Sequence, residues 1–160
     1  MDYNQFVKNE LIGVLDGSQA HRTFQSAVRD FPIEYINTKP PNFVFTFWHL
    51  LEHILRSMKD IVDYMKDPNY QTLNWPDDYW PPRDGEATEQ QWNQTVSETL
   101  ELYDETYSML KDSDLDIFAT VPISKGKHTN LREILIIIDH NAFHVGQFAT
   151  LRRVAGIPAS

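Results

Sequence analysis

Two histidines, His140 and His144, stand four residues apart in the long apolar segment 131–154. In a helix this spacing places both imidazole rings on one face. The helical period predicts that they lie in the middle of a buried stripe with Ile136, Ile137, Phe143, Gln147, Phe148, Leu151 and Val154. An unpaired buried polar ring costs roughly 1–3 kcal/mol, so two interpretations stay open: a shared metal ion, or hydrogen bonds to neighbouring core side chains.

A second pair, His49 and His53, occurs in segment 45–65, where apolar residues recur with the helical period. The stripe consists of Phe47, Leu50, Leu51, Ile54, Leu55, Met58, Ile61, Val62 and Met65. On a helical wheel His53 falls just past the edge of this stripe and can turn inward. His49 falls nearly opposite its centre and is predicted to face solvent or another subunit. His21 is interpreted as an exposed or capping residue outside the site.

A three-histidine site would result if the helices carrying His53, His140 and His144 packed together, because helical bundles gather inward-facing side chains in their cores. Three neutral imidazoles leave positions open on a divalent ion, as in catalytic rather than structural sites. Such an ion can lower the pKa of bound water to about 7 or polarise a substrate oxygen or sulfur. Zinc and nickel both suit imidazole ligands, so the predicted cofactor is a divalent ion of either kind.

Nearby carboxylates give no clear general acid or base. Glu133 precedes His140 by about two turns on the same face, so it could orient a histidine or reach a water on the metal. It could equally be the third-residue partner of an Asn130 cap, which is the favoured interpretation, although Thr129 is also a candidate cap. Asp139 and Glu52 point away from the histidines on the wheel. We therefore assign no catalytic acid or base from the sequence.

The elements that must position these residues are helical. Periodicity and caps predict helices over 4–15, 19–30, 45–65, 88–110 and 130–154. Thr88 and Gln91 have the spacing of a capping box. The connection 112–128 includes a stretch, 118–124, that could be extended. Four main helices without alternating strands predict an all-α four-helix bundle.

The segment 67–85 cannot be a regular element, because it holds four of the nine prolines. It also carries three aromatic residues, Trp75, Tyr79 and Trp80, between acidic ones. Loops of this length are usually functional or packed by their own side chains. Two interpretations are weighted equally: a lid over one end of the helices, or plain aromatic packing.

Length and composition favour a single domain over residues 1–160, with 41% apolar residues and no cysteine. The formal net charge of −9 would repel phosphate backbones, which argues against nucleic acid. Arg152 and Arg153 are interpreted as cations at a helix C-terminus. No window is apolar enough for a membrane span, and the polar N-terminus does not favour export. The absence of cysteine fits a cytoplasmic protein.

The motifs FWHLLEHI, WPDDYWP and LREILIIIDHNAFHVGQFATLRRVAGI resemble those of the DinB-like metal-binding proteins over nearly the whole chain. The most specific part is DHNAFHVGQ followed by LRR. The resemblance implies an up-down-down-up four-helix bundle of the DinB/YfiT-like type, forming a homodimer. It also implies that one histidine of the second helix and two of the last bind a divalent metal. These match His53, His140 and His144, since only His53 follows two leucines and a variable residue.

Some members of the DinB-like family are transferases that use low-molecular-weight thiols such as bacillithiol or mycothiol, and others are described as hydrolases. The resemblance therefore favours a metal-dependent enzyme acting on a small molecule, either by hydrolysis or by thiol transfer. A non-catalytic metal-binding or ligand-binding bundle with a stress-related role is the alternative. A third interpretation is that the histidines bind nothing.

Overall fold

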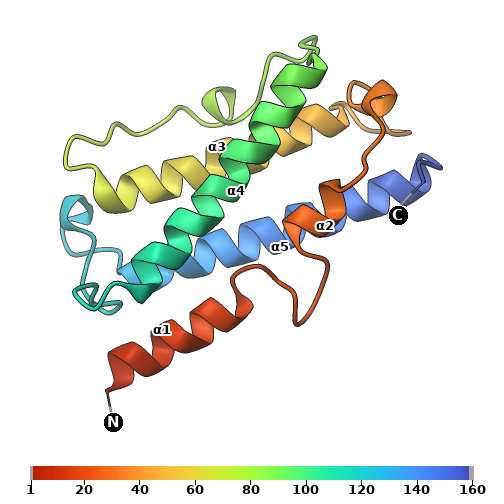
Figure 1. Cartoon of the computed structure of the whole chain (residues 1–160). Coiled ribbons are helices and arrows are strands. Elements are labelled where there is room, and N and C mark those ends of the chain that lie inside the picture. The colour runs from red at the N-terminus through yellow and green to blue at the C-terminus, as the bar shows by residue number, and fades with distance from the viewer. Residues whose placement is uncertain (1, 159–160) are drawn as a thin grey trace.

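The computed structural model describes residues 2–158 of the chain. Within that range every regular element is helical and no strand forms, which confirms the predicted all-α class. The α-helices are α1 (Tyr3–Val14), α2 (Phe24–Val28), α3 (Phe47–Lys66), α4 (Glu89–Lys111) and α5 (Asn130–Val154). Short 3-10 turns occupy Ile33–Tyr35, Asp77–Tyr79 and Pro122–Ser124. Figure 1 shows the long helices α1, α3, α4 and α5, with the short α2 beside α5.

Each α-helix begins after a side chain that accepts a hydrogen bond from an amide of its first turn. These capping residues are Asp2, Thr23, Thr46, Thr88 and Thr129. A cap of this kind contributes about 1 kcal/mol, because it satisfies an amide that has no partner within the helix. The predicted capping box between Thr88 and Gln91 forms, and α5 is capped by Thr129 rather than Asn130.

Two predicted boundaries were wrong. The helix expected over 19–30 is much shorter, since Gly17 turns the chain at φ +76° and Thr23 starts α2 only at Phe24. The stretch 118–124 is extended only at one bridge, from Thr120 to Thr129, and then forms a 3-10 turn. In both segments a residue with positive φ, Gly17 or Lys125, turns the chain and limits the length of the neighbouring element.

Helix α3 packs against both α4 and α5. It runs antiparallel to α5, because the ring of Phe47 at its start meets Phe148 near the end of α5 at 5.4 Å. It runs in the same direction as α4, because Glu52 bonds to Thr95 in the early turns of both helices. Helix α1 starts beside the end of α4, where the Lys8 ammonium donates to the carbonyl of Asp112 at 2.6 Å. These pairings place one face of α3 against α5.

Arg152 and Arg153 lie in the last turn of α5, as predicted. Arg152 is also only 3% exposed, which the sequence did not predict. Its guanidinium donates to backbone carbonyls of Ala27, Arg29, Asp30 and Pro158. The side chain therefore ties α5 to the segment around α2, because these carbonyls lack partners within a helix.

No helix within residues 2–158 combines the length and the apolar character that crossing a membrane would need.

Candidate metal centre

Three histidine side chains converge where α3 faces α5. One ring nitrogen from each of His53, His140 and His144 lies within 4.8 Å of the others. The ring centroids are 5.0 Å apart for His53 and His140, 4.7 Å for His53 and His144, and 4.4 Å for the two histidines of α5. The structure thus brings together the three histidines selected from the sequence. The antiparallel packing of α3 on α5 is what makes them meet.

The donor atoms fit a small divalent ion. The Nε2 atoms of His53 and His140 are 3.2 Å apart. Two nitrogens at about 2.0–2.1 Å from a tetrahedral zinc ion would be separated by about 3.4 Å, so this spacing needs little adjustment. Two basic nitrogens that face each other this closely must share either a proton or a cation.

The hydrogen bonds around the cluster leave two of the Nε2 atoms available as ligands. His53 donates its Nδ1–H to the Tyr79 carbonyl at 3.1 Å, and His144 donates its Nδ1–H to the Gln147 side-chain oxygen at 3.0 Å. Because an oxygen of this kind only accepts, each ring carries its proton on Nδ1 and its lone pair on Nε2. Such partners fix the tautomer and orientation of metal-binding histidines.

His140 differs from the other two histidines. Its Nδ1 is buried without a hydrogen-bond partner, so no contact within the protein fixes the tautomer of this ring. Burial lowers the pKa of His53 and of His140 to about 4, and it also lowers the pKa of His144. All three rings are therefore neutral near pH 7, which is the form that binds a metal ion.

The histidines of α5 lie at the edge of the buried stripe, not in its middle as predicted. The buried face of α5 follows Ile134, Ile137, Asn141, Val145, Phe148 and Leu151. His140 and His144 are only half-buried beside it, and Phe143 is 66% exposed. The helical period is as predicted, but the packing of α3 and α2 selects a face rotated from the one inferred. The site therefore adjoins solvent rather than being sealed in the core.

His49 also departs from its predicted position. Its side chain is 2% exposed instead of facing solvent. The His49 Nδ1 accepts the Thr46 backbone amide at 3.0 Å, and its Nε2 lies 3.0 Å from the Pro82 carbonyl, to which it donates. His49 is thus the third-residue partner in the capping box of α3. The Thr-x-x-His spacing was the available signal, although capping boxes usually use Glu or Gln.

Residues 67–85, which we call the aromatic segment, run back along α3 toward the start of α4, as Figure 1 shows, rather than over one end of the helices. The ring of Trp80 stacks on His53 at 4.0 Å between centroids and 6° between planes. Trp75, by contrast, is 71% exposed, with its ring 6.4 Å from His53. The lid over one end of the helices was therefore the wrong interpretation. The segment packs along the side of α3, where Trp80 contacts the candidate metal ligand His53.

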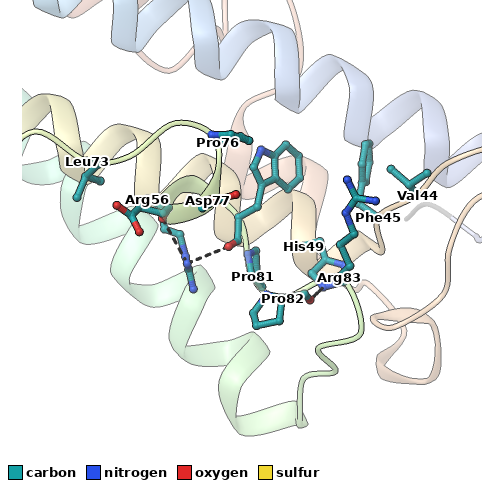
Figure 2. A pocket seen from close by; sticks show the side chains of 12 residues that line it. Val44, Phe45, His49, Arg56, Leu73, Pro76, Asp77, Pro81, Pro82 and Arg83 are labelled. Atoms are coloured by element: carbon teal, nitrogen blue, oxygen red, sulfur yellow. Dashed lines mark hydrogen bonds between the residues drawn. The ribbon is translucent and has the colours of Figure 1, made fainter.

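A cavity of about 980 Å³ opens on the same segment. Figure 2 shows Arg83 beside Phe45 on one side of it and Arg56 beside Asp77 on the other. The lining includes Trp80 but none of the three histidines. The cavity and the three-histidine cluster are therefore neighbours that share contact with Trp80, and the histidines do not line the cavity.

The carboxylates considered from the sequence lie elsewhere. Glu133 is 3% exposed and pairs with Arg132 at 2.5 Å, so it neither partners an Asn130 cap nor orients a histidine of the cluster. Glu52 pairs with Arg56 at 3.0 Å. Among residues 2–158, the three-histidine group includes no carboxylate. His21 is exposed as predicted, bonded to the backbone of Arg22.

Comparison with known proteins gives a family. The sequence model of the DinB superfamily matches residues 17–148, a range that includes all three histidines and the aromatic segment. Searches of curated proteins and of solved structures gave no match. The family match spans most of the chain and confirms the resemblance inferred from the motifs. The chain therefore belongs to the DinB superfamily.

Proposed function

We propose that this protein is a metal-dependent enzyme that acts on a small molecule. Its ion, zinc or nickel, is bound by His53, His140 and His144. The observation that carries the proposal is the convergence of three neutral imidazoles. In His53 and His144, hydrogen bonds from Nδ1 leave the lone pair of Nε2 available to a metal ion. The directions of α1, α3, α4 and α5 support an up-down-down-up bundle. We further propose that residues 1–160 form one domain and that the protein works as a homodimer.

A bound ion would supply Lewis acidity, which activates a thiol or a water molecule at neutral pH. The chain's own residues favour thiol transfer over hydrolysis. Hydrolysis usually needs a nearby acid or base to move protons, and Glu52 and Glu133 are each held by an arginine away from the histidines. A low-molecular-weight thiol needs less help, because its ordinary pKa of about 8.5 is already close to neutral.

The surroundings of the cluster support access for a small substrate. His140 and His144 are half-buried, and the exposed rings of Phe143 and Trp75 lie against the histidines. Exposed aromatic rings beside a half-buried cluster provide apolar contact area for a small ligand. The stacked Trp80 excludes water from one face of His53.

The test begins with elemental analysis of untagged protein beside a variant carrying His140→Ala and His144→Ala. The proposal expects near-stoichiometric zinc or nickel in the parent and none in the variant. The metal-loaded parent is then assayed with small thiols and electrophilic acceptors, and with an ester and amide panel. Turnover of esters or amides alone would favour the hydrolase, and no turnover of either class would overturn the proposal of an enzyme.

A metal that only stabilises the fold is the competing function, since His53 links α3 both to α5 and to the aromatic segment. Thermal unfolding with and without chelator separates the two cases. A protein that loses most of its helical structure on chelation has a structural metal. A protein that stays folded at 25 °C has an ion that is available for chemistry.

A further inference from the structure

One face of α3 holds the aromatic segment at several points. His53, Arg56 and Asp60 recur at the helical spacing on that face. His53 donates to the carbonyl of Tyr79, and Arg56 donates to the carbonyl of Trp80 at 3.3 Å. The backbone of residues 79 and 80 is therefore fixed against α3 beside the metal centre.

Asp60 contacts the segment through both of its carboxylate oxygens. Its two carboxylate oxygens accept the hydroxyls of Tyr70 and Tyr79, each at 2.7 Å. Burial, followed by the hydrogen bond to Asp60, raises the pKa of both tyrosines, so both hydroxyls remain donors. Hydrogen bonds in which a carboxylate accepts a hydroxyl are stronger than those between neutral groups. We name this group of Asp60, Tyr70 and Tyr79 the tyrosine clamp.

Tyr79 connects the tyrosine clamp to the metal centre, because the same residue is held at both ends. Its hydroxyl bonds to Asp60, and its backbone carbonyl accepts the Nδ1–H of His53. The next residue, Trp80, stacks its ring on His53. If the hydroxyl were released, Tyr79 would lose its side-chain anchor on α3, and its carbonyl would be held only by His53 and by the bonds from Arg56 to the carbonyls on either side. His53 could then carry its proton on Nε2, and that tautomer cannot bind a metal through Nε2.

We infer that Asp60 is a positioning residue for the metal centre: through the Tyr79 hydroxyl it holds the carbonyl that fixes the tautomer and orientation of His53. This inference rests on the proposed metal function for its consequence, but the effect on His53 exists in the metal-free protein as well. It assigns a role to the WPDDYWP motif, whose tyrosine supplies both contacts. Outer partners of metal-binding histidines typically change metal affinity by 10–100-fold.

The test compares Tyr79→Phe with Tyr70→Phe in the full-length protein. Each variant removes one hydroxyl from Asp60, but only Tyr79 also contacts His53. Nitrogen-15 NMR of the histidine rings, recorded without metal, reports the tautomer of His53. We expect the parent and Tyr70→Phe to show Nδ1–H, and Tyr79→Phe to show a mixture of both tautomers.

Zinc affinity, measured by competition with a chromophoric chelator, gives the second readout. We expect a loss of about tenfold in Tyr79→Phe and in Asp60→Ala, and a change below about threefold in Tyr70→Phe. Asp60→Asn keeps an acceptor oxygen and should recover part of the loss. Circular dichroism confirms that each variant is folded.

Equal effects of the two tyrosine variants would overturn the inference, because the segment would then act only through its general stability. An unchanged His53 tautomer in both Tyr79→Phe and Asp60→Ala would also overturn it. A parent that binds neither zinc nor nickel would instead refute the proposed function, and the NMR comparison would still decide whether Asp60 positions His53.

Discussion

His49 and His53 lie one turn apart on α3, and each is only 2% exposed. Both nitrogens of His49 have protein partners, the amide of Thr46 and the carbonyl of Pro82. Only the Nδ1 of His53 has such partners, the carbonyl of Tyr79 at 3.1 Å and the more distant hydroxyl of Ser57 at 3.5 Å, and its other nitrogen faces His140. His49 thus caps the start of α3. His53, one turn later, keeps an Nε2 atom whose lone pair is available to a metal ion.

This difference shows that burial and residue type alone do not identify a ligand. A ring with two protein partners has no lone pair left for a metal ion, whereas a ring with one carbonyl partner is held in the tautomer that binds. The hydrogen-bond partners of His49 and His53, rather than their positions on α3, therefore determine which of the two can bind a metal ion. Each prediction below tests one part of this distinction.

The largest expected effect is on metal binding in His53→Ala. Removing one of three ligands should weaken zinc affinity by more than about 100-fold, beyond the range typical of outer partners. His49→Ala is the matched control and should keep near-stoichiometric zinc. Elemental analysis and chelator competition measure both. Zinc retained in His53→Ala, or lost in His49→Ala, would contradict the roles assigned to the two residues.

His49→Ala should instead lower the free energy of unfolding by about 2 kcal/mol. It removes the acceptor of the buried Thr46 amide in the capping box of α3, and it removes the hydrogen bond from His49 to the Pro82 carbonyl, which keeps the Gly85 amide as a partner. Urea unfolding of the metal-free protein measures the change. The exposed His21→Ala serves as control and should stay within about 0.5 kcal/mol of the parent. An equal loss in both variants would argue against a special role for His49.

Gln147→Leu tests the partner of His144. The substitution removes the oxygen that accepts the His144 Nδ1–H at 3.0 Å and should weaken zinc binding by about tenfold. Gln94→Leu on α4 is the control, because Gln94 is exposed and bonds only to Glu98 at 2.7 Å. If both variants bind zinc as the parent does, the Gln147 contact does not orient His144.

The last prediction concerns the effect of pH on the stability of the metal-free protein. Burial lowers the pKa of His53 and His140 from 6.5 to about 4, so the unfolded chain binds more protons than the folded one between these values. Their contribution to stability is therefore complete above pH 6.5 and is lost as pH falls toward 4. Urea unfolding between pH 7 and 5 in chelator should show this decline.

A variant carrying His53→Gln and His140→Gln should show a shallower decline over the same pH range, because two of the titrating groups are gone. The range stops at pH 5, since carboxylates begin to contribute below it. Identical slopes in the parent and the variant would mean that these two histidines do not determine the dependence on pH.

Much of the helical framework could be predicted from the sequence, because its signals are local. The stripe from Phe47 to Met65 and the box between Thr88 and Gln91 gave α3 and the start of α4 correctly. The same local rules failed where one residue turns the chain, as at Gly17 before α2. Local spacing also placed His140 and His144 on a common face, but it put that face in the middle of the buried stripe.

The remaining errors share one cause, which is contact with residues distant in the chain. His49 was assigned to the surface because the Pro82 carbonyl that receives its proton lies 33 residues away. Arg152 lies at the helix end as predicted, but its burial was not predicted, because its carbonyl partners at Ala27, Arg29 and Asp30 are more than 100 residues away. A helical wheel contains no information about such partners.

By itself, the sequence determined the helical class, the main helices, the family and the identity of the three histidines, because repeating patterns and motifs are properties of neighbouring residues. Only the tertiary structure decided which nitrogen of each ring is free, because that depends on the Tyr79 carbonyl reaching His53 and on α3 lying antiparallel to α5. A side chain's type sets the chemistry that it can perform. Its partners across the fold decide whether the required atom and lone pair are available.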